Sequence, residues 1–240
     1  MKGIILFLSL VALAALGALV AVGHFYAPVG LDLEIAKSLL EILTVAVVGQ
    51  AVALTVKLHN DSRRKQAAAD QIRYRALDTL NHTFVSAKRI RRRARARSTV
   101  LSPGEASEHR RITRVQYFKC LEQVNDIQLA LEVLAKDIET RAGLFKEGRG
   151  IFRLVSSMEE YLNGLVDEWE HLSVQFTGQP RAVAVQRLAR FADFIGPYRT
   201  SRFRPKFVHA YYEAVELLRA SLADARSQSW KRRVQPGASA

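Results

Sequence analysis

Hydrophobic positions divide the chain into an apolar start and a longer part in which apolar residues recur at helical spacing. Residues 3–22 form a continuous run without a charged side chain, and residues 39–56 form a second run that contains Glu41 and Gln50. About twenty helical residues, each rising about 1.5 Å, match the roughly 30 Å hydrocarbon core of a bilayer. We therefore expect both runs to be transmembrane helices that form an N-terminal hairpin.

Each run has a second interpretation. The first resembles a cleaved signal peptide, because Ala21-Val22-Gly23 at its end fits a small-x-small cleavage site, but its length exceeds that of a usual signal core and favours a retained helix. The second run has the length of a buried core helix. Pro28 and Gly30 turn the chain before it and cations follow it, which favours the membrane, and Asp32 is placed to cap its first turn.

Beyond Val56, apolar residues return every three or four positions, which is the period of a helix buried on one side. Residues 57–97 contain no Gly or Pro, so the second span can continue directly into this next helix. The apolar stripe consists of Leu77, Leu80, Phe84, Ala87 and Ala94. Arg91 also falls on the stripe, as its one charged exception.

Further helices follow with short connections. Ser102-Pro103-Gly104-Glu105 has the pattern of a capped helix start, and Gly148-Arg149-Gly150 reads as a connector before a helix from Ile151 to Phe176. We expect a shorter helix over 181–195 and a last one from about Pro205. The first of these helices carries the clearest stripe, with Tyr117, Leu121, Val124, Ile127, Leu131, Leu134 and Ile138.

No segment alternates with period two, so the fold class is all-α: a two-helix transmembrane hairpin followed by a cytoplasmic antiparallel helical bundle. Short turns favour packing within one chain over an intermolecular coiled coil. The predicted divisions are a hairpin over 1–58 with spans 3–22 and 39–56, a basic juxtamembrane helix over 59–101, a bundle over 102–233 and a disordered tail over 234–240.

Charge sets the predicted topology. The chain carries 36 basic and 23 acidic residues, a formal net charge of +13, and all of the excess lies beyond residue 56. Because cations close to a span stay on the cytoplasmic side, we expect a multi-pass protein with its N-terminus and its C-terminal domain in the cytoplasm. The candidate contacts to lipid headgroups are Lys57, Arg63, Arg64 and Lys65. The excess of Arg over Lys and the abundant Ala suggest a GC-rich bacterial genome, so the membrane we expect is a bacterial inner membrane.

A run of cations ends the first cytoplasmic helix and is the strongest local signal for a binding site. Its members are Lys88, Arg89, Arg91, Arg92, Arg93, Arg95 and Arg97. We favour a solvated face that pairs with the acidic stretch Glu159–Glu170. Nucleic acid is a less favoured partner, because no aromatic residues are interleaved for base stacking. Lipid contact requires the helix to fold back, since Arg91 otherwise lies about 50 Å beyond Val56, far outside a Debye length of about 8 Å.

A second basic segment and one intramembrane polar residue complete the candidate binding positions. Arg202, Arg204 and Lys206 stand among Tyr198, Phe203 and Phe207 before the last helix, either as a connector whose aromatic rings enter the core or as an anion or partner site. Gln50 is expected to hydrogen-bond between helices; its alternative role is to line a polar path.

The usual signatures of catalysis are absent from the sequence. One cysteine excludes a disulfide framework, and no phosphate loop, dinucleotide fingerprint, nucleophile elbow or zinc-protease motif occurs. Glu168 and His171 have the spacing of a di-iron ligand pair without the second copy that such a site needs. Cys120 lies on the apolar stripe and reads as a core thiol. We expect no catalytic residues, cofactor or metal.

The layout of a membrane hairpin followed by a cytosolic helical domain resembles the two-helix membrane effectors of bacterial conflict systems, in architecture alone. We expect a non-catalytic membrane protein that anchors a basic helical domain for binding a protein partner or forming a homo-oligomer. The alternatives are a pore formed by the hairpin, which the resemblance implies, and a membrane tether for nucleic acid.

Overall fold

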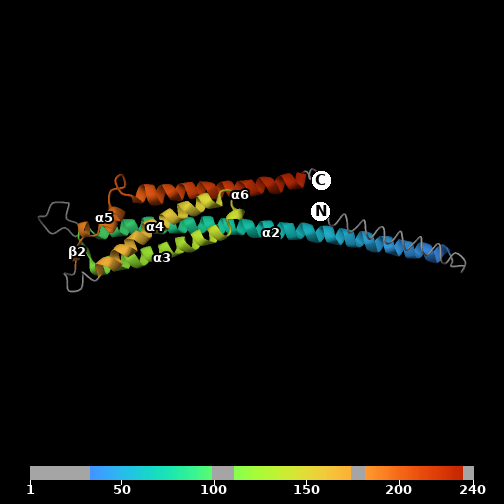
Figure 1. Cartoon of the computed structure of the whole chain (residues 1–240), viewed down its shortest axis with the longest axis horizontal. Helices are drawn as coiled ribbons and strands as arrows, with labels where there is room; N and C mark the ends of the chain where they lie inside the picture. The colour runs from blue at the N-terminus through green and yellow to red at the C-terminus, as the bar shows by residue number, and fades with distance from the viewer. Residues whose placement is uncertain (1–32, 99–110, 174–181, 235–240) are drawn as a thin grey trace. The chain divides into compact units, whose positions relative to one another are not determined.

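Helices dominate the computed structural model of the chain, which describes residues 33–98, 111–173 and 182–234 (Figure 1). This confirms the all-α class. The chain divides into two compact units, Met1–Ala68 and Ala69–Ala240. Helix α2 (Leu33–Arg97) runs without a break from the second apolar run into the basic run, as the lack of Gly and Pro predicts. The first apolar run, 3–22, and Asp32 lie outside the described residues.

The described part of the first unit is helix alone, and it exposes an apolar stripe. Val45, Val48, Val52 and Val56 are 72%, 56%, 58% and 53% exposed. Their spacing of three, four and four residues places them on one face of α2. Within the described residues, no helix has both the length and the apolar character needed to cross a membrane.

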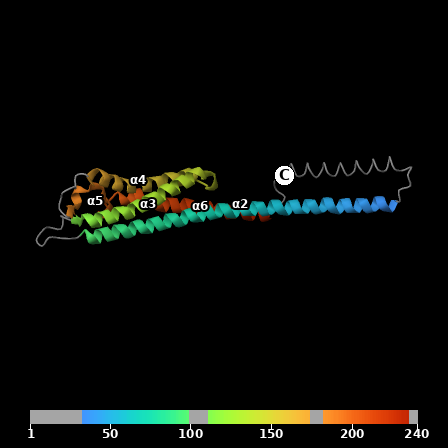
Figure 2. The same cartoon turned by 90° about the horizontal axis from the view of Figure 1, so that it is seen from below.

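Four helices form the second unit: the C-terminal part of α2, α3 (Arg114–Thr140), α4 (Gly148–Ser173) and α6 (Ala210–Val234). They lie side by side around one hydrophobic core, and α3 and α4 are antiparallel neighbours (Figures 1 and 2). Leu80, Leu131, Ile151 and Leu218 represent the four helices in this core and are essentially inaccessible to solvent. The helical periodicity therefore predicted the packed faces correctly.

The C-terminal part of α2 is fixed to the core by stacking and by specific hydrogen bonds. The Phe84 ring stacks on Tyr211 with centroids 3.7 Å apart, and the Tyr211 hydroxyl donates to Asn81 Oδ1 at 2.7 Å. Nearer the middle of the helix, Arg73 Nε donates to the Leu144 carbonyl at 2.8 Å. These contacts join α2 to α6 and to η2 (Ala142–Leu144), the turn that follows α3.

The predicted helix start at Ser102 is wrong for α3. Residues 111–113 form strand β1 (Arg111–Thr113), and α3 begins only at Arg114. Thr113 is the N-cap, because its side-chain oxygen accepts the Gln116 N–H at 3.3 Å. The sequence of residues 102–105 resembles a cap, but the cap that begins α3 lies about three turns further along the chain.

The helix predicted over 181–195 is also wrong in its first half. Strand β2 (Ala182–Ala184) pairs antiparallel with β1, and the 3₁₀ turn η3 (Val185–Arg187) follows it. Only α5 (Ala189–Ile195) is α-helical. Each strand has three residues, which is too short for a period of two to be visible in the sequence.

Gly148 begins α4 and is not part of a connector. A Cβ atom at this position would lie 2.5 Å from the Ala142 carbonyl oxygen, so glycine is the residue that permits the close turn between α3 and α4. Before α6, Pro205 lies in a π-helical turn, η4 (Arg204–His209), and α6 follows it directly, close to the predicted start.

Candidate anion-binding groove

The basic run at the end of α2 contains side chains in two different environments. Arg91 lies on the buried stripe and is only 5% exposed. Its Nε donates to the Phe194 carbonyl at 2.6 Å, and its Nη2 donates to the Gly196 carbonyl. Both acceptors belong to the C-terminal end of α5, where helix carbonyls lack partners within the helix. Arg91 therefore satisfies the end of α5 and has no free face for an external anion.

Aromatic rings surround the Arg91 guanidinium. Tyr198 and Phe203 each place a ring centroid 5.2 Å from its central carbon, within the range of a cation–π contact. Burial lowers the pKa of Arg91, and the nearby charge of Arg95 lowers it further. An arginine still keeps its proton at neutral pH. The cation is therefore held by carbonyl dipoles and ring faces together.

A network around Asp193 holds the segment that supplies these rings. The Tyr161 hydroxyl donates to one carboxylate oxygen at 2.9 Å, and the Arg202 N–H donates to the other at 2.8 Å. The Ser201 hydroxyl donates to the Asp193 carbonyl at 2.6 Å and accepts the Phe203 N–H at 3.1 Å. Burial, and then Asp193, raise the pKa of Tyr161, so its proton stays in place.

Three other arginines of the run share one exposed face of α2. Arg89, Arg93 and Arg97 follow each other at intervals of four residues, or about 6 Å along the axis. Within the part of the chain that the structure describes, none of the three has an ion pair or a hydrogen bond. We call these residues the arginine row.

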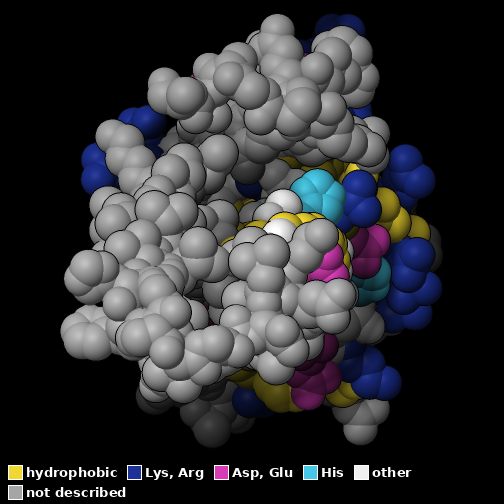
Figure 3. Space-filling model, turned by 90° about the vertical axis from the view of Figure 1, so that its right-hand side faces the viewer, with side chains coloured by type: hydrophobic (Ala, Val, Ile, Leu, Met, Phe, Trp, Pro, Cys, Tyr) yellow, Lys and Arg dark blue, Asp and Glu magenta, His cyan; other side chains and the backbone are white. Residues whose placement is uncertain are grey.

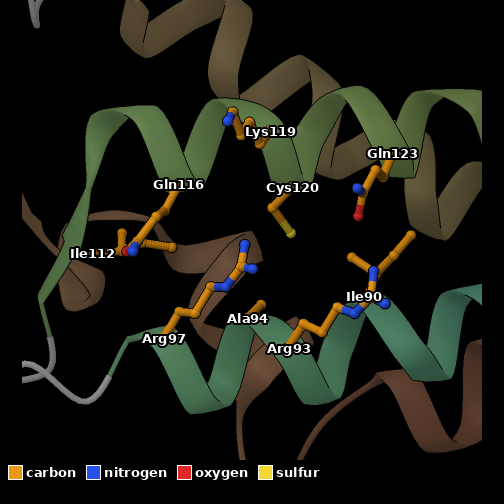
Figure 4. Close-up of a pocket in the computed structure, with 9 residues that line it drawn as sticks. All are labelled: Ile90, Arg93, Ala94, Arg97, Ile112, Gln116, Lys119, Cys120 and Gln123. Atoms are coloured by element: carbon orange, nitrogen blue, oxygen red, sulfur yellow. The ribbon is translucent and has the colours of Figure 1, made fainter.

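The arginine row borders a groove between α2 and α3. The groove consists of two adjoining hollows that share Ile90, Arg93 and Gln123. In Figure 4 the Arg97 side chain extends from α2 towards α3, while Gln116, Cys120 and Gln123 point from α3 towards α2. The first hollow is further lined by Ala94, Ile112 and Lys119, and the second by His82, Thr83, Ser86, Arg89, Asp126, Ile127 and Ala130.

The chemistry of the groove is that of cations and amides, and its thiol is not a candidate nucleophile. Cys120 is buried, and desolvation raises the pKa of its thiol to about 12, against a smaller opposing effect of Arg97. The thiol is therefore protonated and uncharged at neutral pH, in agreement with the predicted core role. Gln116 Oε1 is buried without a hydrogen-bond partner among the described residues. Guanidinium groups and amides at this spacing suit carboxylate or phosphate oxygens.

The remaining cations of the basic run lie outside the groove. Lys88 places its ammonium 5.0 Å from the centroid of the Phe84 ring, which accounts for part of its burial. Arg92 is exposed, and Arg95 is half-buried and has contacts of its own. Figure 3 shows described Lys and Arg side chains with Asp, Glu and His side chains beside them.

The second basic segment is a connector whose aromatic rings enter the core. Phe203 and Phe207 are fully buried and stack with centroids 5.0 Å apart. Arg202, Arg204 and Lys206 remain exposed. Packing explains Phe203 and Phe207, and the binding role of the three exposed cations stays a prediction.

The candidate membrane positions all lie on the described part of the first unit. Gln50 is exposed on α2. Lys57, Arg63, Arg64 and Lys65 are exposed further along the same helix. Their binding roles remain predictions.

Two members of the acidic stretch have partners other than the basic run. Glu159 accepts a hydrogen bond from Gln128 at 2.5 Å. The Glu168 carboxylate accepts the Arg190 and Phe191 N–H groups at 2.7 and 3.0 Å, and so caps the start of α5. The described residues contain no group of three or more His, Cys, Asp or Glu side chains that could hold a metal ion.

Comparison with protein-family models, curated proteins and solved structures gives no match to this chain.

The α3 side of the groove was not predicted from the sequence. The clearest apolar stripe is flanked in sequence by Gln116, Lys119 and Gln123, and nothing in the sequence distinguishes these three from ordinary solvent-exposed positions. Their role depends on which helix lies opposite. The spacing of four within the basic run was the one available signal for the arginine row.

Proposed function

We propose that this protein is a non-catalytic, membrane-anchored adaptor of a bacterial inner membrane. In this proposal the N-terminal hairpin holds the basic helical domain at the cytoplasmic face, where the domain binds a protein partner or a second copy of the chain.

The observation that carries the proposal is the exposed apolar stripe of α2. Val45, Val48, Val52 and Val56 each expose more than half of their surface. Leaving such area in water costs about 25 cal/mol for each Å², so lipid or protein is expected to cover it. Lys57 and the cations at 63–65 follow the stripe and are exposed, as residues at the headgroup level would be.

The groove supports binding in preference to catalysis. Its arginine row cannot act as a general base, and its thiol is protonated at neutral pH. What the groove offers is fixed positive charge and hydrogen-bonding amides, which suit recognition of an acidic group.

Alkaline carbonate extraction of the full chain tests the anchorage. We expect the protein to stay in the membrane pellet, and a fluorescent protein fused after Ala240 to mature inside the cell. Release by carbonate, or a C-terminal reporter that is active only outside the inner membrane, would overturn the proposal.

A matched pair of variants sharpens this test. Val48→Glu with Val52→Glu should weaken retention in the pellet, because each charge opposes insertion by about 3 kcal/mol at the centre of a span. The control, Val85→Glu with Val133→Glu, adds the same charge to exposed valines of the second unit and should leave retention unchanged.

A further inference from the structure

We propose that the groove between α2 and α3 is a docking site for an acidic helical segment of a partner protein. This inference rests on the partner-binding role proposed above and names the chemistry of the partner. The site is one face of the basic run, the arginine row of Arg89, Arg93 and Arg97, together with the α3 side chains opposite it.

The spacing of the cations fits an acidic helix. Adjacent arginines of the row are separated by four residues of α2, or about 6 Å. Carboxylates at every fourth position of a helix lying along the groove have the same repeat, so three pairs can form in register. Each guanidinium presents two parallel N–H groups to a carboxylate, which gives the pairing a preferred geometry.

The groove is built for a protein segment more than for a nucleic acid. Among the described lining residues there is no Phe, Tyr or Trp, and the one aromatic ring is the imidazole of His82, so a single strand would find no row of stacking platforms for successive bases. The floor is apolar, with Ile90 and Ala94 from α2 and Ile127 from α3. Apolar side chains of an amphipathic helix can cover this floor while its carboxylates reach the row.

Charge and hydrogen bonding vary along the groove. Arg93, Arg97 and Lys119 line the first hollow without a carboxylate, whereas Asp126 stands among the residues of the second. A uniform polyphosphate would meet repulsion at Asp126, but a protein segment can place a basic or neutral residue there. The side-chain amides of Gln116 and Gln123 line the groove, and an amide can pair with the N–H groups of a peptide, which a phosphodiester lacks.

The test uses the full chain and a fluorescein-labelled peptide with Glu at every fourth position on an alanine-rich background. We expect saturable binding by fluorescence anisotropy, and weak or no binding of the matched Gln peptide. Arg93→Gln with Arg97→Gln should reduce affinity about tenfold or more, because two charge-assisted contacts are lost. Arg75→Gln with Arg92→Gln removes the same charge from other exposed positions of α2 and should change affinity less than about twofold.

Cys120 gives a second readout that reports on the groove itself. It is the one cysteine of the chain and lines the first hollow. The Glu peptide should slow its modification by methyl methanethiolsulfonate, and the Gln peptide should not. A charge-reversal variant completes the design. Arg93→Glu with Arg97→Glu should no longer bind the Glu peptide and should bind a matched Lys peptide.

Several results would overturn the inference. Equal losses in the two Gln variants would show attraction by net charge alone. Tighter binding of an oligo(dT) strand than of the peptide, lost in the Arg93 and Arg97 variant, would make the groove a nucleic-acid site. Absence of peptide binding would also refute the proposal. None of these results changes carbonate extraction, and the groove variants should stay in the membrane pellet, so failure of this inference and failure of the anchorage are distinguishable.

Discussion

Arg91 and Arg93 are two residues apart on the same helix and have opposite roles. Arg91 is buried, and its guanidinium donates to two carbonyls at the end of α5. Arg93 is exposed at the groove and has no ion pair or hydrogen bond among the described residues. Two residues rotate a helix position by about 200°, which is enough to move a side chain from the core to the opposite face.

The difference shows that a run of cations is several features and not one. The direction in which each side chain leaves the helix separates the members into the buried Arg91, the exposed arginine row and the remaining cations. A count of net charge does not distinguish these residues, but their packing environments differ. The contrast between positions that the packing requires and positions that it leaves open can be tested by substitution.

The largest expected effect is at Arg91. Arg91→Met keeps much of the side-chain volume but leaves the Phe194 and Gly196 carbonyls without their donors, so it should lower the free energy of unfolding by about 3 kcal/mol. Urea unfolding followed by circular dichroism measures this. Arg92→Met at an exposed position should stay within about 0.5 kcal/mol of the parent. Similar losses in both variants would remove the distinction between the two environments.

A smaller loss is expected at Gly148, where two glycines provide the same kind of contrast. Gly148→Ala brings a methyl group against the backbone of Ala142, and we expect a cost of about 2 kcal/mol from the forced movement of the turn. Gly143→Ala, in the same turn, meets no atom within 4 Å and should cost little. If Gly148→Ala unfolds at the parent's urea concentration, the close approach to Ala142 is not required.

The smallest effect concerns Cys120, which lines the groove, and it depends on pH. Burial raises the pKa of Cys120 from 9.0 to about 12 in the folded chain. Because the folded value is the higher one, this contribution to stability is complete below about pH 9 and is lost as the pH rises towards 12. Between pH 8 and pH 10 the parent should therefore lose about 1 kcal/mol more than Cys120→Ala. Urea midpoints at the two pH values measure it.

Equal losses in the parent and in Cys120→Ala would show that the thiol is not desolvated. Tyr161 also has a raised pKa from burial, but it is present in both proteins and cancels in the comparison. The pKa of Tyr117 is raised by burial first, then by Glu168 and by Cys120, so the difference between the parent and Cys120→Ala reports on Cys120 together with its smaller effect on Tyr117.

The helices and their buried faces could be predicted from the sequence because periodicity is a local property. The stripe through Leu80, Phe84 and Ala87 is buried as its spacing indicated, and Arg91 lies on that stripe. Its position was the available sign that this arginine is structural. The sequence could not show that its partners are carbonyls more than a hundred residues away.

Features that depend on distant contacts were missed. The strands β1 and β2 pair segments about seventy residues apart, and each is too short to leave a pattern. In the sequence, Gly148 was interpreted as part of a connecting loop. In the structure, its lack of a side chain allows α4 to begin in close contact with Ala142. The groove likewise needs α3 opposite α2, and helix periodicity does not specify which faces meet.

Glu168 has a consequence for the order in which the chain folds. A helix of seven residues such as α5 is too short to persist alone, and its first N–H groups are satisfied by a carboxylate from α4. It follows that α5 becomes stable only after α4 is in place. The carbonyls that receive Arg91 stand at the far end of this helix, so the burial of that arginine depends in turn on a single carboxylate of α4.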